Sequence, residues 1–221
     1  MERPRITLGK MQNPIRGFLH GTAAIAALAA SVALVMRIPT LGGRIAGAVF
    51  GISMVALYTT SSLYHSVPWR EMWKRRMQRL DHSMIFVLIA GTYTPIAWIA
   101  LGGWMRAATL MVVWTIALVG IAQQSFFPRL ENTFGIALMT TMGWLAVFIM
   151  IPFFRRAGAG AALLMALGGV LYTVGMVFLV TNKPRLWPRI FSYHELFHVM
   201  VVAATSLHFV ATWRYVAPLA A

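Results

Sequence analysis

The segment HELFH, His194 to His198, places two histidines four residues apart near the end of the chain. On a helix, residues four apart share one face, so both imidazoles could bind a single zinc ion, with Glu195 available as a general base. Zinc metalloproteases of the zincin type use this pattern, and so do metal sites that take their remaining ligands from other helices. The spacing predicts a metal-binding helix, and its surroundings must decide between the two kinds of site.

The composition indicates what kind of element carries these histidines. Of 221 residues, 59% are hydrophobic and 11% are charged, with a mean hydropathy of +0.73, far above that of soluble domains. The chain is predicted to be an integral membrane protein of the all-α class. It has no cysteine, so any metal must be held by nitrogen and oxygen ligands.

Seven apolar runs are each long enough to cross about 30 Å of hydrocarbon as a helix. The predicted spans are Gly17–Met36, Gly43–His65, His82–Leu101, Met105–Gln124, Phe134–Phe154, Ala161–Thr181 and Glu195–Tyr215. The loops between them are short, which predicts a single seven-helix membrane domain over residues 1–221. Residues 1–16 form a short basic segment before the first span.

The net charge of +14 comes from 19 Lys and Arg against 5 Asp and Glu. These basic residues lie mainly in the short loops, which predicts contact with anionic lipid headgroups rather than with nucleic acid. One set of alternate loops and ends holds 13 Lys and Arg and the other holds 6. The N-terminus is therefore expected to be cytoplasmic and the C-terminus outside, as an odd number of spans requires.

Three predicted helix ends on the cytoplasmic side carry polar residues. These residues are Ser61 and His65 at the end of the second span, Asp81 and His82 at the start of the third, and His194 and His198 at the start of the seventh. Ionisable residues at membrane depth are costly and usually face the bundle interior or one another. The convergence predicts a metal site at this end of the bundle.

Each predicted site residue has a chemical role. Imidazoles from His65, His194 and His198 would leave one tetrahedral position open for water, which is typical of a catalytic zinc. Asp81 could accept a hydrogen bond from that water and take its proton. Ser61, one turn before His65, could orient His65 or donate to a developing oxyanion.

Plainer interpretations exist for the same residues. Each histidine alone would be an interfacial or hydrogen-bonded residue, and Asp81 alone would suit the N-cap of the third span. A zincin takes its third ligand from beyond the second histidine, where the only histidine is His208, about 15 Å deeper. The third ligand is therefore expected upstream, at His65, and Glu195 is expected to face a loop, a basic side chain or water.

The remaining histidines are expected to lie outside the metal site. His208 is expected to be a buried hydrogen-bonding residue, His20 is expected to lie at the interface, and His82 has no assigned role.

Pro95 should break or kink the third span. Gly43, Gly47 and Gly51 are expected to serve packing within the chain rather than a dimer seam.

The segments SSLYH, LDHSM, GTYTP and HELFHVMVVAATSLHF resemble the hemolysin III family of bacterial membrane proteins. This family is grouped with the progestin and adipoQ receptors, including the adiponectin receptors, and more distantly with the alkaline ceramidases. The resemblance implies seven helices, a cytoplasmic N-terminus, zinc held by His65, His194 and His198, Asp81 near the zinc-bound water, and the serine of the Ser-x3-His motif at Ser61.

The resemblance implies several functions. Kinship with ceramidases implies a zinc-dependent hydrolase of lipid amide bonds, serving lipid homeostasis in the bacterial cytoplasmic membrane. The alternative is a non-enzymatic protein with a structural zinc, acting as a sensor of membrane fluidity or as a cytolysin. The short segment before the first span gives no support for a protein-hormone receptor. A pore would need a polar stripe across the whole bilayer, whereas the predicted polar cluster lies at one end.

Overall fold

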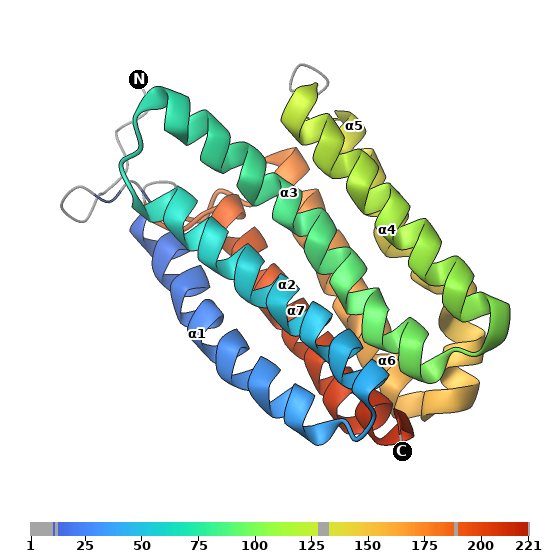
Figure 1. Ribbon diagram of the computed structural model, residues 1–221. Helices are drawn as coiled ribbons and strands as arrows, with labels where there is room; N and C mark the ends of the chain where they lie inside the picture. Colours follow the sequence, from blue (N-terminus) through green and yellow to red (C-terminus); the bar gives the residue numbers. More distant parts are fainter. Residues whose placement is uncertain (1–10, 12, 128–132, 188–189, 221) are drawn as a thin grey trace.

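The computed structural model describes residues 11, 13–127, 133–187 and 190–220, and these form a bundle of long helices (Figure 1). In chain order the helical elements are α1 (Pro14–Arg37), α2 (Leu41–Ser66), α3 (Glu71–Pro95), the π-helix η1 (Ile96–Ala100), α4 (Gly103–Phe126), α5 (Thr133–Trp144), α6 (Ala146–Thr181), α7 (Tyr193–Ala211), the π-helix η3 (Thr212–Val216) and the 3-10 helix η4 (Ala217–Ala220). Most of the basic N-terminal segment, Arg129 and Arg189 lie outside the described residues.

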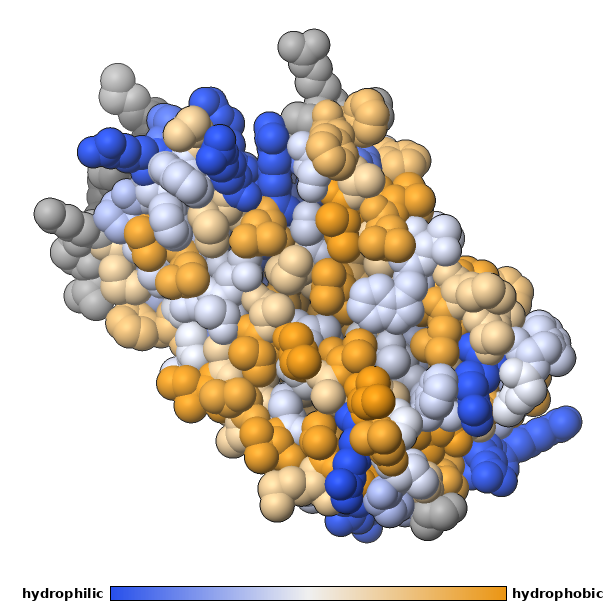
Figure 2. Space-filling view, viewed as in Figure 1, coloured by the Kyte–Doolittle hydropathy of each residue, from blue (hydrophilic) through white to orange (hydrophobic). Residues whose placement is uncertain are grey.

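The surface of the bundle is apolar between its two ends. Large side chains such as Ile25, Ile52 and Phe148 are exposed, and Figure 2 shows hydrophobic residues across the middle with hydrophilic ones gathered toward the ends. Such a surface is stable in lipid because a bilayer is itself an apolar solvent. Six helical stretches of the described chain are long and apolar enough to cross a membrane. The protein is a multi-pass membrane protein.

The fifth of these stretches, Thr133–Thr181, contains two of the predicted spans. Its 49 residues are interrupted at Gly158, which has φ 85° and ψ 173°. A residue with a Cβ rarely adopts this conformation, and glycine does so readily. The predicted spans Phe134–Phe154 and Ala161–Thr181 lie on either side of this glycine.

The third helix starts earlier than its predicted span, whereas its helical stretch ends at Ala100, next to the predicted Leu101. It begins at Glu71, ten residues before Asp81, so the interpretation of Asp81 as an N-cap is wrong. The hydropathy pattern detects only the apolar part, whereas the charged residues before it are also good helix formers. At the other end, Pro95 closes α3 and the wider π-helix η1 follows, as expected for a residue that cannot donate a backbone hydrogen bond.

The first two helices pack closely through glycines. A Cβ at Gly51 would overlap Ser31 of α1, and a Cβ at Gly47 would overlap Ile38, the residue that follows α1, which confirms packing within the chain. Near the other end of α1, a Cβ at Gly17 would overlap Ser66 of α2. This contact at the beginning of α1 brings its first turns against the end of α2.

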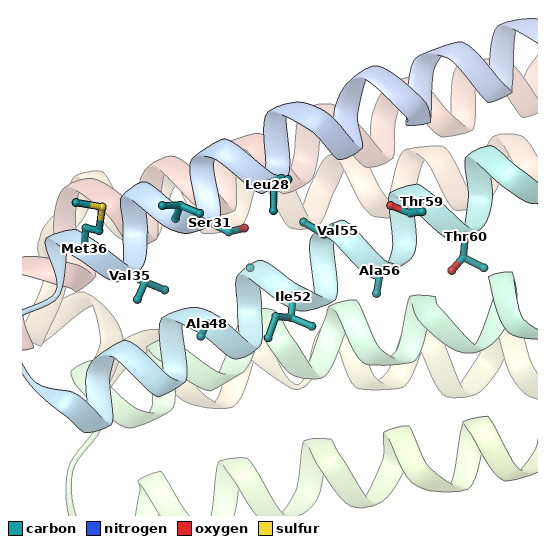
Figure 3. Close-up of a pocket in the computed structure, with 12 residues that line it drawn as sticks. Leu28, Ser31, Val35, Met36, Ala48, Ile52, Val55, Ala56, Thr59 and Thr60 are labelled. Atoms are coloured by element: carbon teal, nitrogen blue, oxygen red, sulfur yellow. The ribbon is translucent and has the colours of Figure 1, made fainter.

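A groove of about 600 Å³ also runs along α1 and α2 (Figure 3). Its lining is almost entirely aliphatic, with Ser31, Thr59 and Thr60 as the polar exceptions, and it contains none of the predicted site residues. The groove opens on the apolar surface, where Leu28, Val32 and Ile52 are exposed. The candidate site lies elsewhere, inside the bundle.

Candidate metal centre

The first histidine of the site belongs to the last turn of α2. This helix ends at Ser66, where the chain becomes extended at Val67 before Pro68, because a residue preceding proline disfavours the helical conformation. His65 is buried, and its backbone carbonyl accepts a hydrogen bond from the Asn13 N–H at 3.1 Å. The beginning of α1 is thus attached directly to the end of α2.

The other two histidines lie in the first two turns of α7. Ser192 is the N-cap, and its backbone N–H donates to the carboxylate of Glu195 at 2.9 Å, forming part of a capping box. The helix therefore begins at Tyr193, immediately before His194. His198 follows one turn later on the same face, and it is buried.

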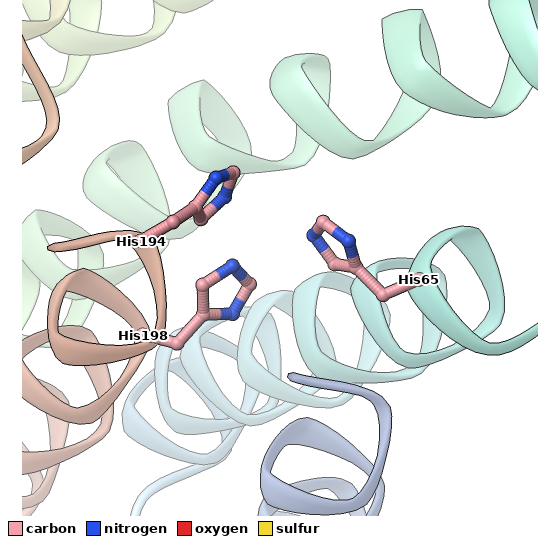
Figure 4. A group of neighbouring side chains, drawn as sticks. All are labelled: His65, His194 and His198. Carbon is pink, nitrogen blue, oxygen red and sulfur yellow. The ribbon is translucent and has the colours of Figure 1, made fainter. Parts of the chain in front are cut away.

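The three imidazoles converge between α2 and α7 (Figure 4). Their ring centroids lie 5.5 Å apart for His65 and His194, 4.9 Å for His65 and His198, and 5.0 Å for His194 and His198. Each residue offers a ring nitrogen, and these nitrogens all lie within 4.8 Å of one another. The group could hold a metal ion that accepts imidazole ligands.

Ser61 and Asp81 meet beside this group. Both side chains are buried, and the Ser61 hydroxyl forms a hydrogen bond with the Asp81 carboxylate. Because Ser61 lies one helical turn before His65 on α2, this bond holds the carboxylate beside the turn of α2 that leads to His65. The chain therefore places an acidic group, a hydroxyl and three imidazoles at one end of the bundle.

Glu195 faces a basic side chain, which is one of the environments expected from the sequence. Its Oε1 accepts a hydrogen bond from Arg16 Nε at 2.7 Å, and both side chains are buried. Its Oε2 accepts the bond from the Ser192 backbone described above. Since both carboxylate oxygens are engaged in this way, Glu195 connects α1 to α7, and the zincin arrangement is not present.

His20 contradicts the expectation of an interfacial residue. It is 3% exposed, and its Nε2 lies 3.0 Å from Nδ1 of His198. Sequence reasoning also missed Arg16, which lies one turn earlier on α1. The sequence did contain a signal: Arg16 and His20 are four residues apart on one helix, and Glu195 and His198 are three residues apart on another. Hydropathy, however, does not indicate which face of α1 turns toward the interior of the bundle.

His208 lies apart from the three-histidine group, as expected. It is buried, and its Nε2 is 3.1 Å from the Met165 carbonyl oxygen on α6. Its ring also packs near Tyr172 at a centroid distance of 5.6 Å. The expectation of a buried hydrogen-bonding residue is confirmed.

His82 is half-buried next to Asp81 and is not one of the three converging histidines.

Comparison with known proteins places this arrangement in a family. The family model described as haemolysin-III related matches residues 9–209. The chain belongs to this haemolysin-III-related family. This chain is 34% identical to Hemolysin-3 of Bacillus cereus over 205 residues, which cover 91% of this chain and 90% of the relative.

Two further relatives extend the comparison. The Hemolysin-3 homolog of Bacillus subtilis is 33% identical over 200 residues, covering 89% of this haemolysin-III-related chain and 90% of the relative. The monocyte to macrophage differentiation factor of Homo sapiens is 22% identical over 204 residues, covering 90% and 82%. All three matches extend over about nine-tenths of this chain.

Proposed function

We propose that this protein is a zinc-dependent hydrolase that cleaves lipid amide bonds in a bacterial cytoplasmic membrane and so serves membrane lipid homeostasis. One observation carries the proposal. Ring nitrogens of three histidines from two helices lie within 4.8 Å of one another, and the buried Asp81 carboxylate is hydrogen-bonded to Ser61, which lies one turn before His65 on α2. Three neutral ligands with an acidic group close by are the components of a hydrolytic metal site.

His65, His194 and His198 would hold the zinc ion. Nitrogens bound to one tetrahedral zinc at about 2.0–2.1 Å are about 3.3 Å apart. The separations of up to 4.8 Å therefore require the rings to close by about 1.5 Å at most, which a small side-chain rotation supplies. When bound, zinc would act as a Lewis acid that polarises a carbonyl and makes water more acidic.

Asp81 would take and return the proton in this mechanism. A carboxylate has two oxygens, so one can remain bonded to the Ser61 hydroxyl while the other receives a proton. A serine hydroxyl has only one hydrogen to donate, and here it faces Asp81. Ser61 is therefore better suited to orienting Asp81 than to donating to an oxyanion.

We also propose a membrane topology of seven crossings with a cytoplasmic N-terminus. At 1.5 Å per residue, the 49 residues of Thr133–Thr181 would measure about 74 Å as a straight helix, more than twice the hydrocarbon thickness. Two crossings joined near Gly158 resolve this excess. The excess of Lys and Arg on the side of the metal centre supports placing that side in the cytoplasm.

The lipid partners would meet the basic end of the bundle. The first turns of α3 expose Arg75 and Arg76, and the Arg76 guanidinium lies 5.0 Å from the Trp73 ring centroid. Basic and aromatic side chains together suit a surface of anionic headgroups. The acyl chain of a cleaved lipid would reach the site from within the bilayer.

The metal site is tested by measuring metal content. Purified, chelator-free wild type should contain about one zinc per chain by plasma mass spectrometry, because three imidazoles complete the protein's share of the ligands. The double variant His194→Ala/His198→Ala should contain almost none. Wild type without bound metal would contradict the proposal.

The hydrolase is tested with Asp81→Asn. This substitution preserves shape but removes the proton acceptor, so zinc content should be unchanged while fatty-acid release from N-acyl lipids falls by about 100- to 10,000-fold. Released fatty acid is measured by mass spectrometry. Undiminished release by Asp81→Asn would reject the role of Asp81.

The names of the relatives favour a second candidate function. Two of them are called Hemolysin-3 or its homolog, which suggests a cytolytic or membrane-modulating protein in which zinc joins α2 to α7. In that case chelation should strongly lower the thermal stability, without any lipid hydrolysis by the intact protein. The purified protein should then lyse vesicles or alter their order.

A further inference from the structure

His20 makes a specific contact with one of the three histidines. His198 Nδ1 lies 3.0 Å from His20 Nε2 and 3.3 Å from His20 Nδ1, and the two ring centroids are 4.2 Å apart. Both side chains are 3% exposed. The edge of His20 that carries both nitrogens therefore faces a single nitrogen of His198 in the bundle interior.

Neighbouring contacts hold His20 in this position. Tyr58 of α2 packs edge-on against its ring at a centroid distance of 5.2 Å. The Ser62 hydroxyl donates to the Gly17 carbonyl at 2.8 Å, and Gly17 allows the two helices to approach closely. The ring is fixed by α2 on one side and meets α7 on the other.

A second polar contact aligns α1 with α7. Arg16 lies one turn before His20 and bonds to Glu195, which lies three residues before His198. Residues three and four apart on a helix share a face, so Arg16 and His20 form one edge of α1 that meets one edge of α7. The register between the two helices is thereby set by two pairs of side chains.

This contact determines which nitrogen of His198 remains available. An imidazole that binds a metal through one nitrogen usually donates its other N–H to a partner, and the partner sets the tautomer and the ring orientation. His20 occupies Nδ1 of His198. Nε2 is then the nitrogen left to face His65 and His194.

We propose that His20 is a positioning residue that accepts the Nδ1–H of His198, and thereby sets the tautomer and rotation in which His198 presents Nε2 to the metal. The inference rests on the proposed metal site. It assigns to α1 a part in the site although α1 supplies no ligand. Loss of such a partner typically lowers metal affinity by about 10- to 100-fold.

The test compares two substitutions of His20 in the full-length protein. His20→Gln retains a carbonyl oxygen that can accept the N–H, whereas His20→Leu removes every acceptor. Zinc affinity is measured by competition with a chelating dye, and coordination is followed by the visible absorption of the cobalt-substituted protein. His20→Leu should bind zinc about 10- to 100-fold more weakly with an altered cobalt spectrum, while His20→Gln should remain close to wild type.

A matched control separates positioning from general stability. His208→Leu also replaces a buried histidine near α7, but its ring bonds to Met165 and is not part of the three-histidine group. It should lower the melting temperature without changing zinc affinity. If His20→Leu does not fold, His20→Phe supplies a second variant, with a ring but no nitrogen or oxygen to accept the Nδ1–H of His198.

The outcomes distinguish the inference from the proposed function. Wild type that binds no metal overturns both. Wild type that binds zinc with His20→Leu equally tight overturns the role of His20 alone. Equal weakening by His20→Leu and His20→Gln shows that the imidazole is needed for packing rather than as an acceptor, and this also overturns the inference. Rescue by glutamine supports it.

Discussion

Two buried histidines of α7, ten residues apart, have different surroundings. His198 contacts three other histidines, which come from α1, α2 and α7 itself. His208 contacts Tyr172 and a backbone carbonyl of α6, and its Nδ1 has no hydrogen-bond partner among the described residues. Residue type and burial are the same at the two positions. What differs is the side chains that neighbouring helices bring to that depth.

The two regions also differ in how they are held together. The end with the candidate metal centre has a buried ion pair, Arg16 with Glu195, between the first and last long helices. The region around His208 is held by neutral groups, including a hydrogen bond between Tyr172 and Thr205. Gly168 leaves space for the His208 ring, because a Cβ there would overlap it. One region is organised by charge and imidazoles, and the other by close packing.

Replacing each histidine by alanine is the strongest test of this comparison. His198→Ala removes one of the three proposed ligands and should weaken zinc binding by more than the roughly 100-fold that loss of a supporting partner costs. His208→Ala should bind zinc as tightly as wild type, because its ring is directed to Met165. Zinc affinity is measured by chelator competition. Similar losses in both variants would mean that the two regions are not distinct.

Glu195→Gln tests whether charge holds the metal end together. It leaves the Arg16 guanidinium buried opposite a neutral amide and should lower the free energy of unfolding by about 3–5 kcal/mol. Tyr172→Phe removes a neutral hydrogen bond in the other region and should cost only about 1 kcal/mol. Unfolding in detergent with increasing dodecyl sulfate measures both. A smaller loss for Glu195→Gln than for Tyr172→Phe would reverse the comparison.

Gly168→Ala tests whether packing holds the other region together. The added Cβ would overlap His208, so the free energy of unfolding should fall by about 1–3 kcal/mol. The neighbouring Gly169 has nothing within 4 Å of its Cβ position, and Gly169→Ala should be neutral or stabilise the helix by about 0.5–1 kcal/mol. Both variants should retain zinc. Equal stability of the two variants in the same detergent assay would argue against tight packing around His208.

The sequence predicts membrane helices and a three-histidine group because both depend on position along the chain. Span length follows from runs of apolar residues, and depth follows from the distance to the end of each run. His65, His194 and His198 therefore receive a common depth without a structure, and His208 is separated from them by ten residues. The same reasoning misplaces the start of α3, because helix formation continues through charged residues that hydropathy does not count as membrane-spanning.

By itself, the sequence determined the class of protein, the approximate spans and the depth of its polar residues, because hydrophobicity acts locally along each helix. Only the tertiary structure decided which faces meet. Whether His20 turns toward lipid or toward His198 depends on the rotation of α1 about its axis, which is set by Gly17, Ser62 and the Arg16–Glu195 pair. These contacts join residues far apart in sequence, and their geometry arises only when the helices pack.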